Sequence, residues 1–110
     1  MLVYQLCVPI SLMYHRVGEA KYPSTNVSPE MFKQHLEEIK NSGLKYIEPN
    51  IFKKQILEGK AFSQRYILLT VDDAFKSFYQ NAWPILKENK IPFILFVSTE
   101  PVGKRGYMTW

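Results

Sequence analysis

Residues 67–75 have the sequence Ile67-Leu68-Leu69-Thr70-Val71-Asp72-Asp73-Ala74-Phe75, which is the most informative stretch of the chain. A short apolar run rich in Ile, Leu and Val is typical of a strand that is buried on both faces. Asp72 and Asp73 directly follow this run, so two neighbouring carboxylates are expected where the strand ends. Such carboxylates repel each other and attract cations, and proteins rarely keep them together without a metal ion or a proton. Because ligands bind at the carboxyl ends of strands in open α/β sheets, we expect the chemistry of this chain to begin here.

Outward from this strand, strands and helices are predicted to alternate along the chain. Ser28 is placed as the N-cap of the clearest helix, with Pro29 at its first position and Gly43 as its C-terminal stop. Pro84 is expected either to kink a later helix or to mark its late start. The predicted elements are a strand over residues 9–14, a helix over 29–42, a strand over 44–47, a helix over 49–58, a strand over 66–71, a helix over 77–90 and a strand over 91–97.

The order strand, helix, strand predicts an α/β fold with parallel strands, because parallel neighbours need a crossover connection. The second helix is expected to carry four apolar residues on or near its buried side: Ile51, Phe52, Ile56 and Leu57. A chain of 110 residues has room for one domain or for part of a larger one. The last strand would leave an apolar edge open, so we interpret the chain as the first part of a larger α/β domain.

The composition is that of a folding chain without a nucleic-acid or membrane signature. Hydrophobic residues make up 46% of the chain, and 14 Lys and Arg against 10 Asp and Glu give a net charge of +4. The basic residues are scattered rather than clustered, so no nucleic-acid partner is predicted. The segment from Met1 to Met13 is too short to span a bilayer and lacks the basic start of a signal peptide. We therefore expect no transmembrane segment and take a cytoplasmic location as the default. Cys7 is the only cysteine, which rules out an internal disulfide.

Three segments read together resemble the polysaccharide deacetylases, also called the NodB-homology family or carbohydrate esterase family 4. They are Tyr14-His15-Arg16-Val17, Leu69-Thr70-Val71-Asp72-Asp73 and the crossover from Pro84 to Phe96. The resemblance extends from about Pro9 to Trp110 and corresponds to the N-terminal part of the family's domain. It implies a NodB-like distorted (β/α) barrel with parallel strands, of which residues 1–110 would form a partial domain truncated at the C-terminus.

The resemblance also implies an activity and the residues that carry it. The family consists of hydrolases of carbohydrate metabolism that act on a carbon–nitrogen bond other than a peptide bond, and they remove N-acetyl groups from a polysaccharide or amino sugar. They use a divalent metal, Zn²⁺ or similar. On this resemblance Asp72 is the catalytic general base and Asp73 is a metal ligand. The chemistry agrees, because a metal lowers the pKa of its bound water and a nearby carboxylate can take the proton. Substrate-binding residues and the oligomeric state are not assigned.

The chain departs from the family's pattern at several points. Val71 and Ala74 stand where the usual Thr-Phe-Asp-Asp-Gly motif has Phe and Gly, and alanine enters a tight turn less readily than glycine. The family's two metal-binding histidines, from a His-Ser/Thr-x-x-x-His motif, have no match, because the only histidines are His15 and His35. A catalytic zinc typically needs three protein ligands plus water. The metal site is therefore expected to be incomplete, and the chain inactive as it stands.

Some residues and functions keep two interpretations. His15 either lines the mouth of the site or hydrogen-bonds to backbone, and His35 is expected at the boundary of a helix's apolar stripe. The alternative to an enzyme is a non-catalytic carbohydrate-binding or structural remnant of the same fold. A receiver-like phosphoacceptor domain also holds acids at a strand end. It would need a further Asp after a later strand, where this chain has Ser98 and Thr99.

Overall fold

A parallel sheet lies at the centre of the fold, and β5 is its middle strand. In the computed structural model, which describes residues 7–110, the strands are β1 (Ile10–Tyr14), β2 (Arg16–Val17), β3 (Asn26–Val27), β4 (Lys45–Tyr46), β5 (Tyr66–Asp72) and β6 (Ile94–Phe96). β1 pairs along one edge of β5, with Ile10 opposite Ile67 and Tyr14 opposite Val71. On the other edge, β4 pairs with the start of β5 and β6 with its end, while β2 and β3 form a separate pair. All these pairs are parallel, which confirms the predicted α/β class.

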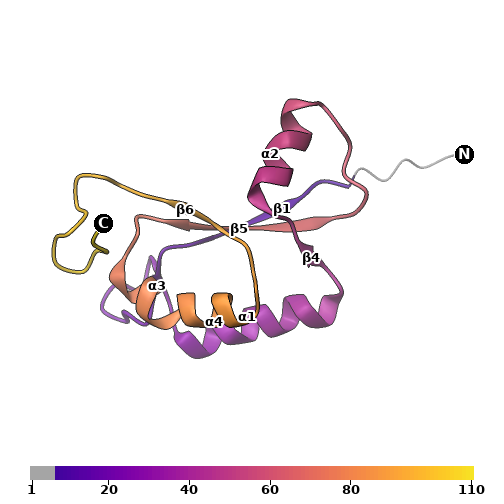
Figure 1. Ribbon diagram of the computed structural model, residues 1–110. Helices are drawn as coiled ribbons and strands as arrows, with labels where there is room; N and C mark the ends of the chain where they lie inside the picture. The colour runs from indigo at the N-terminus through magenta and orange to yellow at the C-terminus, as the bar shows by residue number, and fades with distance from the viewer. Residues whose placement is uncertain (1–6) are drawn as a thin grey trace, which may run out of the picture.

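The helices cover the two faces of the sheet unequally. They are α1 (Pro29–Ser42), α2 (Pro49–Leu57), α3 (Lys76–Asn81) and α4 (Trp83–Glu88). Figure 1 shows α1, α3 and α4 together beneath the sheet, while α2 stands on the opposite side. These crossovers return the chain to the same end of the sheet each time, as parallel pairing requires. The carboxyl ends of β1, β5 and β6 therefore meet at one edge of the sheet. The loop that follows β6 starts from the same edge (Figure 1).

α1 begins and ends where the sequence predicts. The Ser28 hydroxyl accepts a hydrogen bond from the Met31 N–H at 3.1 Å, and Pro29 occupies the first turn. Gly43 ends the helix with φ of 77°, a left-handed conformation that glycine adopts without steric penalty. The helix thus presents its buried residue Phe32 toward the sheet.

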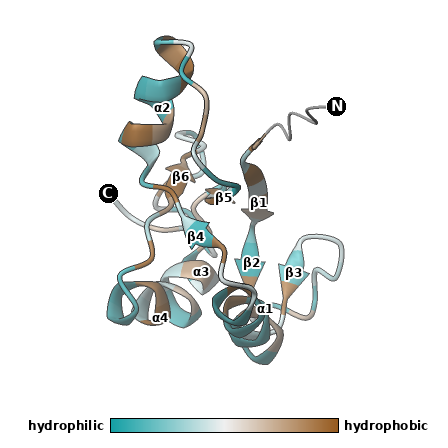
Figure 2. Ribbon diagram, turned by 90° about the vertical axis from the view of Figure 1, so that its right-hand side faces the viewer, coloured by the Kyte–Doolittle hydropathy of each residue, from teal (hydrophilic) through white to brown (hydrophobic). Residues whose placement is uncertain are grey.

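The core lies between the sheet and the three helices beneath it. Leu69 of β5 is buried together with Phe32 of α1, Phe78 of α3 and Leu86 of α4. Because side chains alternate along a strand, Thr70 faces the opposite side of the sheet. In Figure 2 the ribbons of α1 and α4 are mostly teal with brown stretches, the mixture of polar and apolar residues expected for helices with one buried stripe. One face of β5 therefore contributes to the core, and the other face, with Thr70, points away from it.

The expectation that α2 buries its apolar residues is wrong. No residue of α2 is buried, and Ile51, Ile56 and Leu57 are all more than half exposed. Phe52 is partly covered, because its ring stacks on that of Phe62 with the centroids 5.9 Å apart. α2 stands on the face of the sheet opposite the core (Figure 1). Within residues 7–110 no second layer packs over it, so its apolar spacing does not lead to burial.

The helix predicted over residues 77–90 is divided into α3 and α4, with Ala82 between them. Pro84 lies in the first turn of α4, where its missing N–H has no helical partner to lose. Neither expectation for Pro84 holds as stated: the helical segment begins at Lys76 rather than late, and it is interrupted at Ala82 instead of kinked. The strand predicted over 91–97 is also shorter, since β6 covers only 94–96. Pro92 cannot donate to the ladder, which is consistent with the late start of this strand.

Within residues 7–110, no helix combines the length and the apolar character needed to cross a membrane. The sequence does not predict a signal peptide over Met1–Met13, and residues 1–6 of this segment lie outside the described residues. Cys7 is partly buried and unpaired.

Replacing a leucine by alanine should have different effects on stability on the two sides of the sheet. Leu69→Ala should lower the free energy of unfolding by about 2–5 kcal/mol, because it opens a cavity in the core. Leu57→Ala, at a side chain that is 75% exposed, should change it by no more than about 0.5 kcal/mol. Urea unfolding followed by circular dichroism measures both. Equal losses would show that α2 is buried after all.

Candidate active site

Polar side chains from three strands meet at the carboxyl edge of the sheet. His15 directly follows β1, Asp72 is the last residue of β5, and Ser98 lies two residues beyond β6. The parallel pairing of these strands brings residues that are 26 to 83 positions apart in sequence to one edge. Edges of this kind are where ligands bind in α/β proteins.

Two contacts define the geometry of this edge. His15 Nε2 lies 3.6 Å from Asp72 Oδ2, within ion-pair distance when the imidazole is protonated, and both side chains remain about a quarter to a third exposed. The Ser98 hydroxyl donates a hydrogen bond to Asp73 Oδ1 at 3.1 Å. The two carboxylates therefore have different partners: an imidazole for Asp72 and a hydroxyl for Asp73. This division fits two different chemical roles.

The turn that carries the carboxylates has an unusual backbone. Asp73 has φ of 72° and Ala74 has φ of 53°, so two successive residues with side chains are left-handed. This region is unfavourable for alanine, and it is the position where the resemblance expects glycine. Two backbone hydrogen bonds of 2.9 Å secure the turn, from the Asp73 N–H to the Phe96 carbonyl and from the Met108 N–H to the Ala74 carbonyl. The surrounding structure thus holds the turn in its strained form.

A cavity of about 600 Å³ opens along the face of the sheet opposite the core, and Asp72 and Asp73 lie in its wall. Met13, Thr70 and Phe96 line it from β1, β5 and β6, so a mostly apolar surface leads to the acids. Its size lies within the range of ordinary ligand sites. The acidic edge therefore has room for a substrate beside it.

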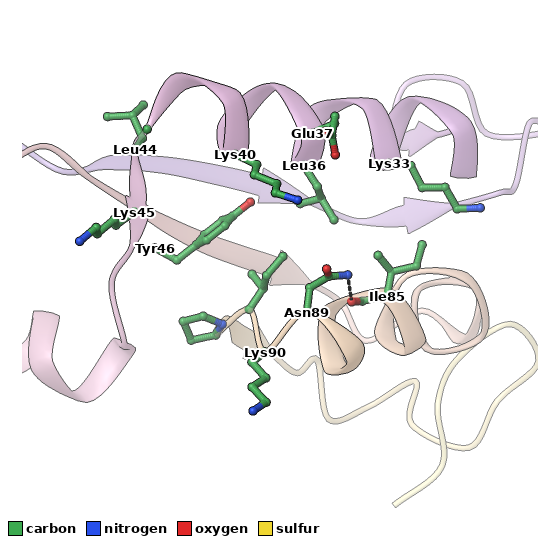
Figure 3. Close-up of a pocket in the computed structure, with 13 residues that line it drawn as sticks. Lys33, Leu36, Glu37, Lys40, Leu44, Lys45, Tyr46, Ile85, Asn89 and Lys90 are labelled. Atoms are coloured by element: carbon green, nitrogen blue, oxygen red, sulfur yellow. Dashed lines mark hydrogen bonds between the residues drawn. The ribbon is translucent and has the colours of Figure 1, made fainter.

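A second, larger cavity of about 710 Å³ lies on the helix side, between α1, β4 and α4. Figure 3 shows Lys40 reaching across this groove, with the Tyr46 ring beneath it. Glu37 is its only acidic residue, and Asp72 and Asp73 do not line it. Size alone would favour this groove, but it lacks paired carboxylates, so the smaller cavity is the candidate active site.

The structure gives His15 and His35 different surroundings. His15 lies beside Asp72 at the carboxyl edge of the sheet, but it is not among the residues that line the cavity. His35 lies on α1 and shares a hydrogen bond of 2.8 Å with the Tyr14 hydroxyl, as a partly buried residue at the helix boundary. Burial, together with the nearby Tyr46, raises the pKa of Tyr14 to about 12, so this phenol stays protonated. The sequence did not assign His15 to the site. Its position directly after a strand was the signal that could have placed it near the carboxylates.

The described residues do not assemble a complete metal site. Among residues 7–110, no three His, Cys, Asp or Glu side chains are grouped so that they could hold a metal ion. Asp73 has the donor type and the accessible position of a ligand, but it is a single carboxylate. A divalent ion bound here would need further ligands.

Comparisons with known proteins agree with this geometry. Residues 59–108, which include both carboxylates, match the family model described as polysaccharide deacetylase. The poly-β-1,6-N-acetyl-D-glucosamine N-deacetylase of Staphylococcus aureus is 29% identical over 112 aligned positions, covering 89% of this chain and 38% of that protein. The chain is therefore similar to the polysaccharide deacetylases over most of its length. This similarity leaves the receiver-like alternative without support.

Solved structures extend the family likeness to the fold. IcaB from Ammonifex degensii superposes with a TM-score of 0.79 at 30% identity, over 92% of this chain and 43% of that chain. The Streptococcus pyogenes deacetylase PplD, solved in complex with acetate, gives 0.74 at 25% identity over 90% and 47%. The parallel α/β arrangement is therefore that of the polysaccharide deacetylases, and the chain covers part of their barrel. It spans 34% and 38% of the length of two curated relatives.

The strained turn leads to a prediction about stability. Ala74→Gly removes a left-handed penalty of roughly 1–2 kcal/mol, and the greater freedom of glycine in the unfolded chain returns about 0.4–1 kcal/mol of this. The free energy of unfolding should therefore rise by up to about 1.6 kcal/mol, measured by chemical denaturation.

Lys90→Gly is the matched control, because Lys90 also has φ of 53° but lies at the exposed end of α4. It should stabilise the protein to a similar extent. A loss of stability for Ala74→Gly beside a gain for Lys90→Gly would mean that the methyl group of Ala74 matters more than its backbone strain.

Proposed function

We propose that Asp72, Asp73 and His15 belong to the active site of a metal-dependent hydrolase that removes N-acetyl groups from a polysaccharide or amino sugar. The observation that carries this proposal is the contact of 3.6 Å between His15 and Asp72, directly beside a second carboxylate at the carboxyl ends of parallel strands. The match of residues 59–108 to the polysaccharide deacetylase model supports it. Residues 1–110 would contribute one part of the deacetylase domain.

The proposed reaction is the hydrolysis of an amide. Water adds to the carbonyl carbon, the carbon–nitrogen bond breaks, and the products are acetate and an amine. Asp72 Oδ2 takes the proton from the attacking water, for which its partial exposure beside the cavity leaves room. The His15 imidazole, 3.6 Å away, is placed to hold a proton and pass it to the departing nitrogen. An imidazole and a carboxylate at this spacing provide an acid and a base in one site.

Asp73 is proposed as one ligand of a divalent metal. Its carboxylate is positioned by the Ser98 hydroxyl and faces the same cavity as Asp72. A metal ion bound there would polarise the amide carbonyl and make its bound water more acidic. The remaining ligands are not among the described residues, so the proposed metal site is completed from elsewhere in the active protein.

The direct test is release of acetate by the protein expressed from its complete gene. Because the S. aureus relative is named as a poly-β-1,6-N-acetyl-D-glucosamine deacetylase, this polymer is the first substrate to assay, with N-acetylated chito-oligosaccharides as the second. Activity should disappear with a chelator and return with Zn²⁺ or a similar ion. Binding of the glycans without acetate release under any metal would favour the non-catalytic carbohydrate-binding alternative.

Asp72→Asn should lower kcat/KM by about 10²–10⁴-fold, the usual contribution of a general base. The amide keeps the shape of the carboxylate but cannot take a proton from water. Bound metal, measured by elemental analysis of the purified protein, should remain at the wild-type level. If turnover survives, Asp72 is not the base.

Asp73→Asn should instead reduce the metal content itself, because the amide is a weaker ligand than a carboxylate for a divalent cation. Elemental analysis and titration with Zn²⁺ measure this loss without relying on activity. Activity should partly return as the metal concentration is raised. Wild-type metal affinity in this variant would contradict the ligand role of Asp73.

A further inference from the structure

Arg16 lies between two aromatic rings next to the proposed active site. The carbon atom of its guanidinium group is 3.7 Å from the centroid of the Phe75 ring and 4.1 Å from that of Tyr22. The Phe75 ring also contacts the ring of Tyr107, with the centroids 4.9 Å apart. We call these four side chains, Tyr22, Arg16, Phe75 and Tyr107, the stacked column. It joins three separate segments of the chain around the carboxyl edge of the sheet.

Polar contacts fix Arg16 in this position. Its Nε lies 3.2 Å from Glu19 Oε2, and its Nη1 donates a hydrogen bond to the Thr25 hydroxyl. Glu19 Oε2 also accepts a hydrogen bond from the Ser77 hydroxyl at 2.7 Å. The Arg16 side chain is only 15% exposed. A planar cation that is desolvated and held from its edge presents its two faces to the rings in one orientation.

The column acts on the strained turn of the active site. Phe75 directly follows Asp73 and Ala74, the two residues with positive φ, and it is 5% exposed. Strained backbone of this kind persists only where the surrounding structure holds it. Two hydrogen bonds hold the turn from one side, and the Phe75 ring, pressed between Arg16 and Tyr107, anchors its end from the other.

We propose that Arg16 is a positioning residue, which holds the Asp73–Ala74 turn through Phe75 and thereby orients the Asp73 carboxylate. Arg16 itself does not contact the carboxylates in this arrangement: its partners are Glu19, Thr25 and the two rings. The effect on catalysis rests on the proposed deacetylase function. The effect on the turn does not, because it concerns only contacts among described residues.

Arg16→Met tests the proposal, since it keeps the apolar stem and removes the planar cation. Lys21→Met is the matched control, because the Lys21 ammonium lies 5.4 Å from the same Tyr22 ring but outside the column. Hydrogen exchange is followed at the amides of Asp73 and Met108, whose hydrogen bonds secure the turn. Exchange at both amides should become about tenfold faster in Arg16→Met, because a left-handed residue costs about 1–2 kcal/mol and about 1.4 kcal/mol corresponds to a factor of ten. Exchange should stay unchanged in Lys21→Met.

Kinetic measurements distinguish a positioning role of Arg16 from a general effect on stability. In the protein from the complete gene, Arg16→Met should lower kcat by about 10–100-fold with little change in KM, the effect of a small misplacement of a reacting group. Adding Ala74→Gly should restore exchange protection and kcat about tenfold, because an unstrained turn no longer depends on the column. A purely structural role of Arg16 would not be rescued at this one position.

Each outcome decides the proposal. Wild-type exchange in Arg16→Met, an equal effect of Lys21→Met, or no rescue by Ala74→Gly would overturn it. If Arg16→Met does not fold, Tyr22→Leu removes one face of the column at a side chain that is 40% exposed, and the same faster exchange is expected there. If the wild-type protein releases no acetate, the proposed function fails, while the exchange measurements still decide whether Arg16 holds the turn.

Discussion

The burial of β5 is the constraint on which the rest of the structure depends. This strand has partners on both edges and three helices beneath it, so its helix-facing side chains, such as Leu69, must be apolar. The pleat then commits the alternate residues to the opposite face. When the strand ends, the same alternation delivers Asp72 to the cavity rather than to the core. The position of the chemistry thus follows from the packing of the strand.

The candidate site combines a carboxylate on a regular strand with a carboxylate on a strained turn. Asp72 belongs to the strand itself and is supported by the ladders with β1 and β6. Asp73 lies one residue further on, in a left-handed conformation that the chain adopts only because its surroundings hold it. Two adjacent carboxylates can therefore point to different partners, His15 and Ser98, without sharing one environment. Such a difference in surroundings is what assigns separate roles to neighbouring acids.

The match to the polysaccharide deacetylase model and the geometry of the edge support the same interpretation from independent directions. The family model covers the carboxylates and the loop after β6, but not His15, which the fold itself brings to Asp72. The exposed apolar side of α2 and the open inner face of the sheet fit a chain that covers part of a barrel. The basic groove between α1 and α4 is not lined by Asp72 or Asp73, so it has no role in the proposed reaction.

The sequence by itself determined the alternation of strands and helices, both ends of α1 and the acidic strand end, because caps, apolar spacing and strand patterns are local signals. It also indicated through Ala74 that the turn would be strained. Burial could not be read in the same way, since apolar spacing in α2 does not reveal which face of the sheet the helix will meet. Only the tertiary structure decided that His15 joins Asp72 and that Arg16 lies against Phe75. These pairs are separated by more than 50 residues, and they become neighbours only because β1 pairs with β5 and places the segments after both strands side by side.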